Sequence, residues 1–225
     1  ADQGGAAGSL GRGEGGVFWG TTKRVHYVLG IYDGLKGFSN RDNNKLYAVR
    51  LAYHLLSIES NFGYYTSSTY FGEQGDILTI GFSFQNQIDG TGSVTESGDF
   101  YSYTFDILSE TVMSDGGVIT LEADYKIFDS DFTPVSPPTS GFDSCFCLFD
   151  GYSVFSTIAY LFPKVVGWGK FQPYARYVNN SPSDARSSDS IEMGLNYIID
   201  GQDTKFNLNY VQGDANASGL SLIHI

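Results

Sequence analysis

The chain has 225 residues, of which 41% are hydrophobic and 16% are aromatic. Its 28 glycines, 16 tyrosines and 17 phenylalanines suit many short turns between strands, so we expect an all-β class. Twenty-five acidic residues against 13 basic ones give a formal net charge of -12, which would repel phosphate backbones and argues against a nucleic-acid-binding protein.

Alternation of apolar and polar residues, the pattern of a strand with two different faces, recurs along the chain. We expect about 11–12 strands in a single domain that covers residues 1–225, with no domain linker. The candidate segments are, in chain order, residues 15–20, 23–34, 45–56, 76–87, 99–108, 118–127, 151–162, 168–178, 190–199, 204–211 and 217–225. Longer links are expected at residues 57–74 and 128–150.

The segment "DILTIGFSFQNQ", Asp76 to Gln87, raises the question of which strand face points inward. One face carries leucine, isoleucine and phenylalanine, and the other carries threonine, glycine, serine and glutamine. Candidate strands of about ten residues exceed the usual ~5–6 of globular proteins and match the ~9–11 of membrane barrels. The polar faces, with small and amide side chains and isolated charges, resemble the wall of a water-filled lumen. We therefore expect a transmembrane antiparallel β-barrel whose apolar faces contact lipid.

Tyrosines recur on the apolar faces, often near strand ends. In a soluble core each buried hydroxyl would require a partner, whereas an interfacial girdle leaves the ring in lipid and the hydroxyl in water. The girdle hypothesis therefore requires fewer coincidences. These tyrosines are Tyr47, Tyr53, Tyr101, Tyr125, Tyr160, Tyr177, Tyr197 and Tyr210.

Two other functions remain open from the residues alone. A soluble β-sandwich could pack the same apolar faces against each other and display its tyrosines to carbohydrate, as a binding or adhesion module. An outer-membrane enzyme of lipase type would need a serine, a histidine and an acid near one rim. Spacing assigns no such trio, so we expect no enzymatic activity.

No cofactor or metal site is expected. Cys145 and Cys147 lie near no histidine or further cysteine, so two small apolar residues in a loop explain them better than a metal site. Asp129 and Asp131 in "FDSDF" match only half of a calcium loop, because its glycine and terminal glutamate are missing. No apolar run approaches the roughly 20 residues that a membrane helix requires.

Five segments carry a family resemblance: "RVHYVLGIYDG", "LYAVRLAYHLL", "GYYTSSTYFGEQGDILTIGFSFQNQ", "FQPYARY" and "EMGLNYIIDGQDTKFNLNY". In order and approximate spacing they resemble the later part of the phosphate-selective porin O and P family, and the last two are the most specific. The resemblance implies a bacterial outer-membrane porin, usually a trimer, with about sixteen strands in the complete barrel, which passes small anions or general solutes by diffusion. The family's first strands have no counterpart before Gly13, so we expect roughly the last two-thirds of such a barrel here.

The sequence departs from that family in features that concern selectivity. The phosphate-selective members have arginine ladders and lysine clusters in the pore, whereas this chain is acidic and its basic residues are scattered. Its last residue is Ile225, where such barrels typically carry phenylalanine. Phosphate selectivity is therefore not part of the expectation.

Alternation also assigns the residues that would line the pore. We expect a wall of mixed charge that is slightly basic, with most other acids, including Asp89, Asp129 and Asp189, in turns and loops that form an acidic mouth. The histidines of the wall are interpreted as polar lining rather than as bases or metal ligands. The expected pore-lining residues are Arg24, His26, Arg50, His54, Gln85, Asp106, Glu122, Asp124, Lys126, Lys170, Arg176, Glu192 and Lys205.

Two interpretations of this wall remain open. Opposed carboxylate and guanidinium groups can create a transverse field that orients hydrated solutes without binding them tightly. Alternatively, Arg50, Arg176 and Lys205 only pair with neighbouring acids across strands and hold the shape of the wall.

Overall fold

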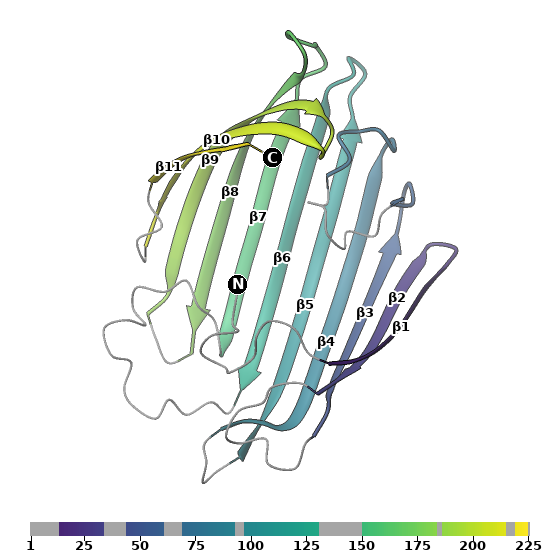
Figure 1. Cartoon of the computed structure of the whole chain (residues 1–225), viewed down its shortest axis with the longest axis vertical. Helices are drawn as coiled ribbons and strands as arrows, with labels where there is room; N and C mark the ends of the chain where they lie inside the picture. Colours follow the sequence, from purple (N-terminus) through teal and green to yellow (C-terminus); the bar gives the residue numbers. More distant parts are fainter. Residues whose placement is uncertain are drawn as a thin grey trace.

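A computed structural model describes residues 14–33, 44–60, 69–92, 97–130, 150–183, 186–214 and 219–224. These residues form one antiparallel sheet of eleven strands, in which each strand pairs with its neighbours in sequence (Figure 1). The expected all-β class is confirmed. No α-helix in the described residues is long and apolar enough to cross a membrane.

Each strand lies where alternation predicts one, although several are longer than expected. β4 and β5 each have 16 residues, because their pairing continues past a register shift between Gln87 and Thr91. The strands are β1 (Gly15–Thr22), β2 (Val25–Tyr32), β3 (Leu46–His54), β4 (Ile77–Gly92), β5 (Ser97–Val112), β6 (Val118–Ser130), β7 (Gly151–Leu161), β8 (Lys170–Pro182), β9 (Ser188–Asp200), β10 (Thr204–Gly213) and β11 (Gly219–His224).

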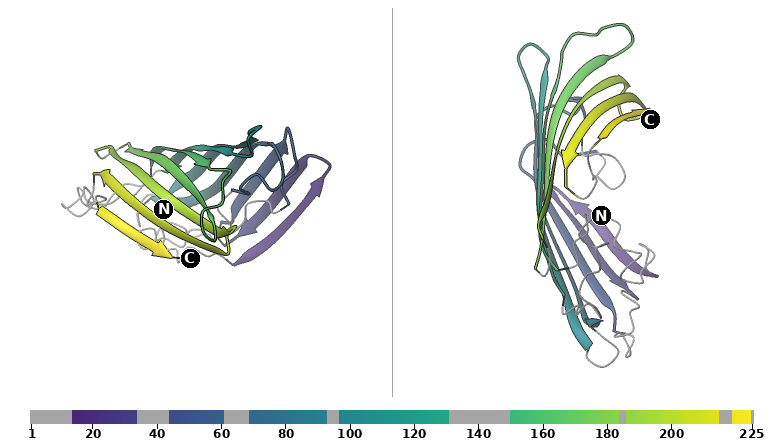
Figure 2. Two further views of the ribbon diagram at one scale, coloured as in Figure 1. Left: turned by 90° about the horizontal axis from the view of Figure 1, so that it is seen from above. Right: turned by 90° about the vertical axis from the view of Figure 1, so that its left-hand side faces the viewer.

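The sheet is strongly curved and forms a trough, with β1 and β2 on one side and β9 to β11 on the other (Figure 2). Accumulated strand twist bends a many-stranded sheet in this way. β1 and β11 are the two edges of the sheet and do not pair with each other in the described residues. The described strands therefore form an open, curved sheet, and the closed barrel stays a prediction.

The apolar strand faces lie on the outside of the trough and are exposed. In β4, Ile80 keeps 46% of its surface exposed, whereas Thr79 and Gln87 on the other face keep 5% and 0%. Side chains on the concave face converge and cover one another, while those on the convex face diverge. In the described part of the chain, no second sheet covers the convex face.

Aromatic pairs extend along the convex face where registered residues oppose each other. The Phe82 and Phe105 rings lie 5.1 Å apart, as do those of Phe84 and Tyr103, and both pairs join β4 to β5. Cross-strand pairs of this kind each stabilise a sheet by about 0.2–1 kcal/mol. The apolar face thus contributes to sheet stability although it is exposed.

The small hydrophobic core lies on the concave side, at the end of the trough where β5 and β6 are joined. Val118, Leu161 and Ile198 are buried there beneath Phe71, which belongs to the link between β3 and β4. We call residues 69–75 of this link the crossbar. Of the other expected link, residues 128–130 belong to β6, and residues 131–149 lie outside the described part of the chain.

Candidate functional site

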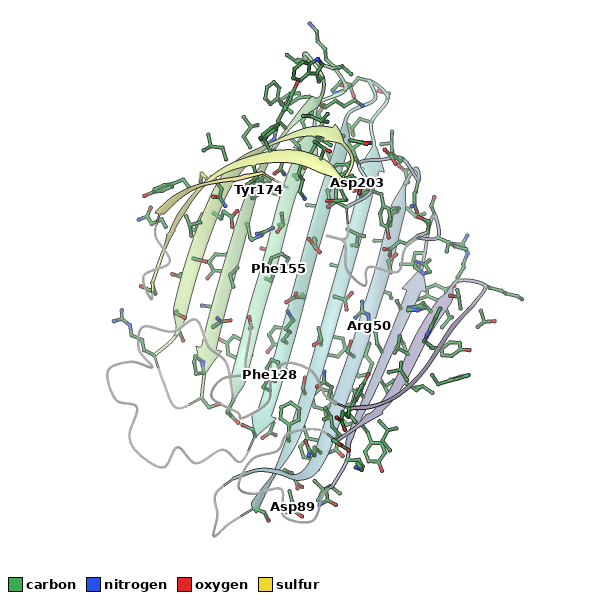
Figure 3. The ribbon with its side chains drawn as sticks, viewed as in Figure 1. Arg50, Asp89, Phe128, Phe155, Tyr174 and Asp203 are labelled. Atoms are coloured by element: carbon green, nitrogen blue, oxygen red, sulfur yellow. The ribbon has the colours of Figure 1, made fainter. Side chains whose placement is uncertain are left out.

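The sheet gathers almost all the expected pore-lining residues on its concave face. Arg24 lies in the turn between β1 and β2, and the strand register places the other twelve on one face, where Figure 3 labels Arg50. These twelve are His26 on β2, Arg50 and His54 on β3, Gln85 on β4, Asp106 on β5, Glu122, Asp124 and Lys126 on β6, Lys170 and Arg176 on β8, Glu192 on β9 and Lys205 on β10.

A first ion pair crosses an intervening strand. Arg50 on β3 donates from Nη1 and Nη2 to the two carboxylate oxygens of Asp106 on β5, at 2.6 and 2.8 Å, and Nη1 also donates to Ser83 Oγ at 3.1 Å. β4 lies between the two residues. Gly81 on β4 provides the space for the Asp106 carboxylate, because a Cβ at this position would come within 2.4 Å of both Asp106 oxygens. Arg50, Ser83 and Asp106 over Gly81 form the Arg50 cluster.

A second set of contacts surrounds Arg176 on β8. Its Nε donates to Thr157 Oγ1 at 3.2 Å and its Nη1 to Glu192 Oε2 at 3.3 Å. The guanidinium carbon also lies 5.3 Å from the centre of the Phe155 ring and 5.7 Å from that of Tyr174, both labelled in Figure 3. Such cation–π contacts stabilise a partly desolvated arginine.

Glu192 is shared by further donors. Its Oε1 accepts hydrogen bonds from the Tyr174 hydroxyl and, at 2.7 Å, from Asn209 Nδ2. The Tyr174 ring lies across β9 over Gly194, where a Cβ would come within 2.3 Å of the ring. Together with Arg176, Thr157 and Phe155, these residues form the Arg176 cluster.

A row of amide side chains continues this cluster toward the crossbar. Asn207 Nδ2 donates to Asn196 Oδ1 at 2.8 Å, and Asn196 Nδ2 donates to Gln172 Oε1 at 3.0 Å. The three residues are register partners on β10, β9 and β8. Neutral amides thus join β8, β9 and β10 between the Arg176 cluster and the crossbar.

Two further cations bear on the interpretation of the wall. Lys126 Nζ lies 3.0 Å from Asp124 Oδ2, two positions away on the same strand and face. Lys205 Nζ donates instead to Gln202 Oε1 at 2.9 Å. Cross-strand pairing with an acid, expected for Arg50, Arg176 and Lys205, is therefore present for the two arginines, whereas the contact described for Lys205 is an amide.

The end of the trough near the crossbar holds a buried polar group that alternation did not assign. Glu110 on β5 is fully buried on the concave face, and Glu59 is 6% exposed. The strand expected there ends at residue 108, whereas β5 continues to Val112 and includes Glu110, which faces the same side of the sheet as Asp106. His54, expected as polar pore lining, is only 1% exposed at this end, with Nδ1 3.0 Å from Thr79 Oγ1 and 3.7 Å from Glu59 Oε1.

The acids expected in loops at one mouth are distributed differently. Asp89, Asp129 and Asp189 lie inside β4, β6 and β9, all near the strand ends opposite the crossbar, because these strands run longer than alternation predicts. Glu59 lies at the crossbar end instead. The structure thus places acids at both ends of the trough.

No group of three or more candidate metal ligands occurs in the part of the chain that the structure describes. Asp129 lies in β6, whereas Asp131, Cys145 and Cys147 fall outside the described residues.

Searches against family models, curated proteins and solved structures gave no match to this chain. The resemblance to the phosphate-selective porin O and P family therefore rests on the sequence segments that carry it and stays a prediction.

Proposed function

We propose that this protein is an outer-membrane porin, which forms a water-filled channel for the passive diffusion of small hydrophilic solutes or ions. The observation that carries the proposal is the distribution of side chains between the two faces. Large apolar residues of successive strands, such as Ile80, Phe105 and Leu121, are 46 to 52% exposed on the convex face, while charged and amide residues line the concave one. This is the inverse of a soluble fold and the pattern of a barrel in lipid.

A bilayer imposes a further requirement on the sheet edges. Each backbone group left without a hydrogen bond in hydrocarbon costs several kcal/mol, so the edges of β1 and β11 must be paired there. We propose that the sheet closes in the membrane, in a complete barrel of about sixteen strands as the family resemblance implies. Outer-membrane lipids and further copies of the chain, in a trimer, are the proposed partners.

The concave face suits conduction without tight binding. The guanidinium groups of Arg50 and Arg176 are already paired with carboxylates of the wall, so at these two positions a passing ion meets a local dipole rather than an uncompensated charge. Weak interactions of this kind allow a solute to enter and also to leave. The proposed pore is accordingly one of general diffusion, without phosphate selectivity.

The first test is the conductance of detergent-purified protein in a planar bilayer under a potassium chloride gradient, with heat-unfolded protein as the control. Discrete steps are expected, and the sign of the reversal potential will show whether cations or anions pass more easily. Protein that dissolves without detergent and gives no steps would overturn the proposal and favour a soluble carbohydrate-binding or adhesion module.

A further inference from the structure

The crossbar is anchored to the concave face by one carboxylate. Glu110 Oε1 accepts hydrogen bonds from the backbone amides of Tyr70 at 3.0 Å and Phe71 at 3.3 Å, and Oε2 accepts one from the amide of Gly72 at 3.2 Å. The Thr120 hydroxyl donates to Oε1 at 3.2 Å. Three consecutive amides and a hydroxyl thus supply the hydrogen bonds that a buried carboxylate requires.

The backbone of the crossbar is shaped for this close approach. Phe71 and Gly72 have φ angles of 56° and 78°, which lie in the left-handed region. A residue other than glycine adopts this conformation only at a cost in free energy. A Cβ on Gly72 would come within 2.6 Å of Val118 Cγ2, so glycine is required on both grounds. The turn directs the Phe71 side chain onto Val118, Leu161 and Ile198 of β6, β7 and β9.

The crossbar also reaches the far side of the trough. Gln202, in the turn between β9 and β10, donates from Nε2 to the carbonyl oxygen of Thr69 at 2.9 Å. In Figure 1 the β9–β10 hairpin arches over the concave face at this end, and Figure 3 labels Asp203 in its turn. A link between β3 and β4 therefore touches a turn more than 130 residues away in sequence, and the crossbar extends from β5 and β6 in the middle of the sheet to the β9–β10 turn.

We propose that the crossbar is the constriction of this pore and that Glu110 is its anchor, so that residues 69–75 set the conductance and the size limit for solutes. The inference rests on the proposed function, because a constriction has meaning only in a channel. It follows from position: the crossbar occupies the concave side, along which solutes would pass, and joins β5 and β6 in the middle of the sheet to the β9–β10 turn at its side. A buried carboxylate is a costly way to hold a loop that serves only as a connection.

The test compares the wild type with Glu110→Gln. This substitution keeps the size of the side chain and removes the negative charge of the group that accepts hydrogen bonds from the three backbone amides. Asp115→Asn is the matched control, because Asp115 lies in the exposed turn between β5 and β6 rather than on the wall, and its carboxylate also accepts a hydrogen bond from a backbone amide, that of Gly117 at 2.9 Å. Single-channel conductance is expected to rise on the order of two-fold in Glu110→Gln, since the narrowest part of a pore limits conduction, and to stay near the wild-type value in the control.

A second readout does not depend on conduction. Hydrogen exchange of the amides of Tyr70, Phe71 and Gly72 is expected to accelerate on the order of ten-fold in Glu110→Gln, because hydrogen bonds to a charged group are lost. Gln202→Ala, which removes only the contact to Thr69, serves if Glu110→Gln does not fold. It is expected to raise conductance in the same direction, by less.

The outcomes separate the two proposals. Conductance steps that are unchanged in Glu110→Gln while exchange accelerates would overturn the constriction and leave the porin function standing. Unchanged exchange would overturn Glu110 as the anchor. A wild type without steps would overturn the porin function and the constriction together, while exchange would still decide whether Glu110 holds the crossbar.

Discussion

The Arg50 cluster and the Arg176 cluster hold their guanidinium groups in different ways. Arg50 makes a two-pronged ion pair with a single carboxylate, that of Asp106, across β4. Arg176 shares the Glu192 carboxylate with Tyr174 and Asn209 and lies against two aromatic rings. The first arginine therefore pairs with a carboxylate through two hydrogen bonds, whereas the second shares its carboxylate with other donors in a network.

This difference separates the two interpretations of the wall. A pair that only maintains shape can be weakened without changing which ions pass, whereas a pair that contributes to the field cannot. Because one cluster is simple and the other is shared, the same substitution is expected to affect stability and selectivity in different proportions at the two sites.

Charge reversal should have the largest effect. Arg176→Glu and Arg50→Glu each change the wall by two charge units and place two carboxylates side by side, which repel by about 4 kcal/mol at ~4 Å with an effective dielectric constant of about 20. Reversal potentials in a potassium chloride gradient are expected to shift toward cations in both variants. A reversal potential that stays at the wild-type value in a folded variant would leave only the shape-holding role.

Neutralising one carboxylate in each cluster should give a smaller effect with opposite rankings in two measurements. Asp106→Asn is expected to shift the reversal potential toward anions more than Glu192→Gln. Without its carboxylate partner, Arg50 keeps the hydrogen bond to Ser83, whereas Arg176 keeps the hydrogen bond to Thr157 and also its contacts with two aromatic rings, which hold its charge in place. Glu192→Gln is expected to lower the free energy of unfolding more, by about 1.5–3 kcal/mol, since Glu192 accepts from three donors. Urea unfolding followed by fluorescence measures the second quantity, and equal rankings in both measurements would contradict the distinction between the clusters.

The glycines beneath the clusters offer the smallest perturbation, because no charge changes. Gly81→Ala would displace the Asp106 carboxylate and Gly194→Ala the Tyr174 ring, each at a cost of about 1–3 kcal/mol of overpacking. Gly16→Ala on β1 is the control, because an added Cβ there meets nothing within 4 Å. Unfolding midpoints that match this control would show that the close packing over Gly81 and Gly194 is dispensable.

Most of the sheet can be read from the sequence, because alternation is a local property. The strand that begins at Ile77 and the one that begins at Val118 lie within one residue of where the pattern starts. The C-terminal ends of several strands lie up to five residues beyond the expected ends, as for β4, which ends at Gly92 rather than at residue 87. Polar residues there continue the backbone pairing without alternating with apolar ones. This is also why Glu110 and Asp89 were assigned to no strand.

The sequence by itself determined the number and position of the strands and which residues share a face, since a side-chain period of two needs no information from elsewhere in the chain. Only the tertiary structure decided that Arg50 reaches Asp106 across Gly81, that Arg176 shares Glu192 with Tyr174, and that the crossbar meets Gln202. These contacts depend on register and on curvature accumulated over several strands. Both are set by the pairing of segments far apart in sequence, which no local pattern contains.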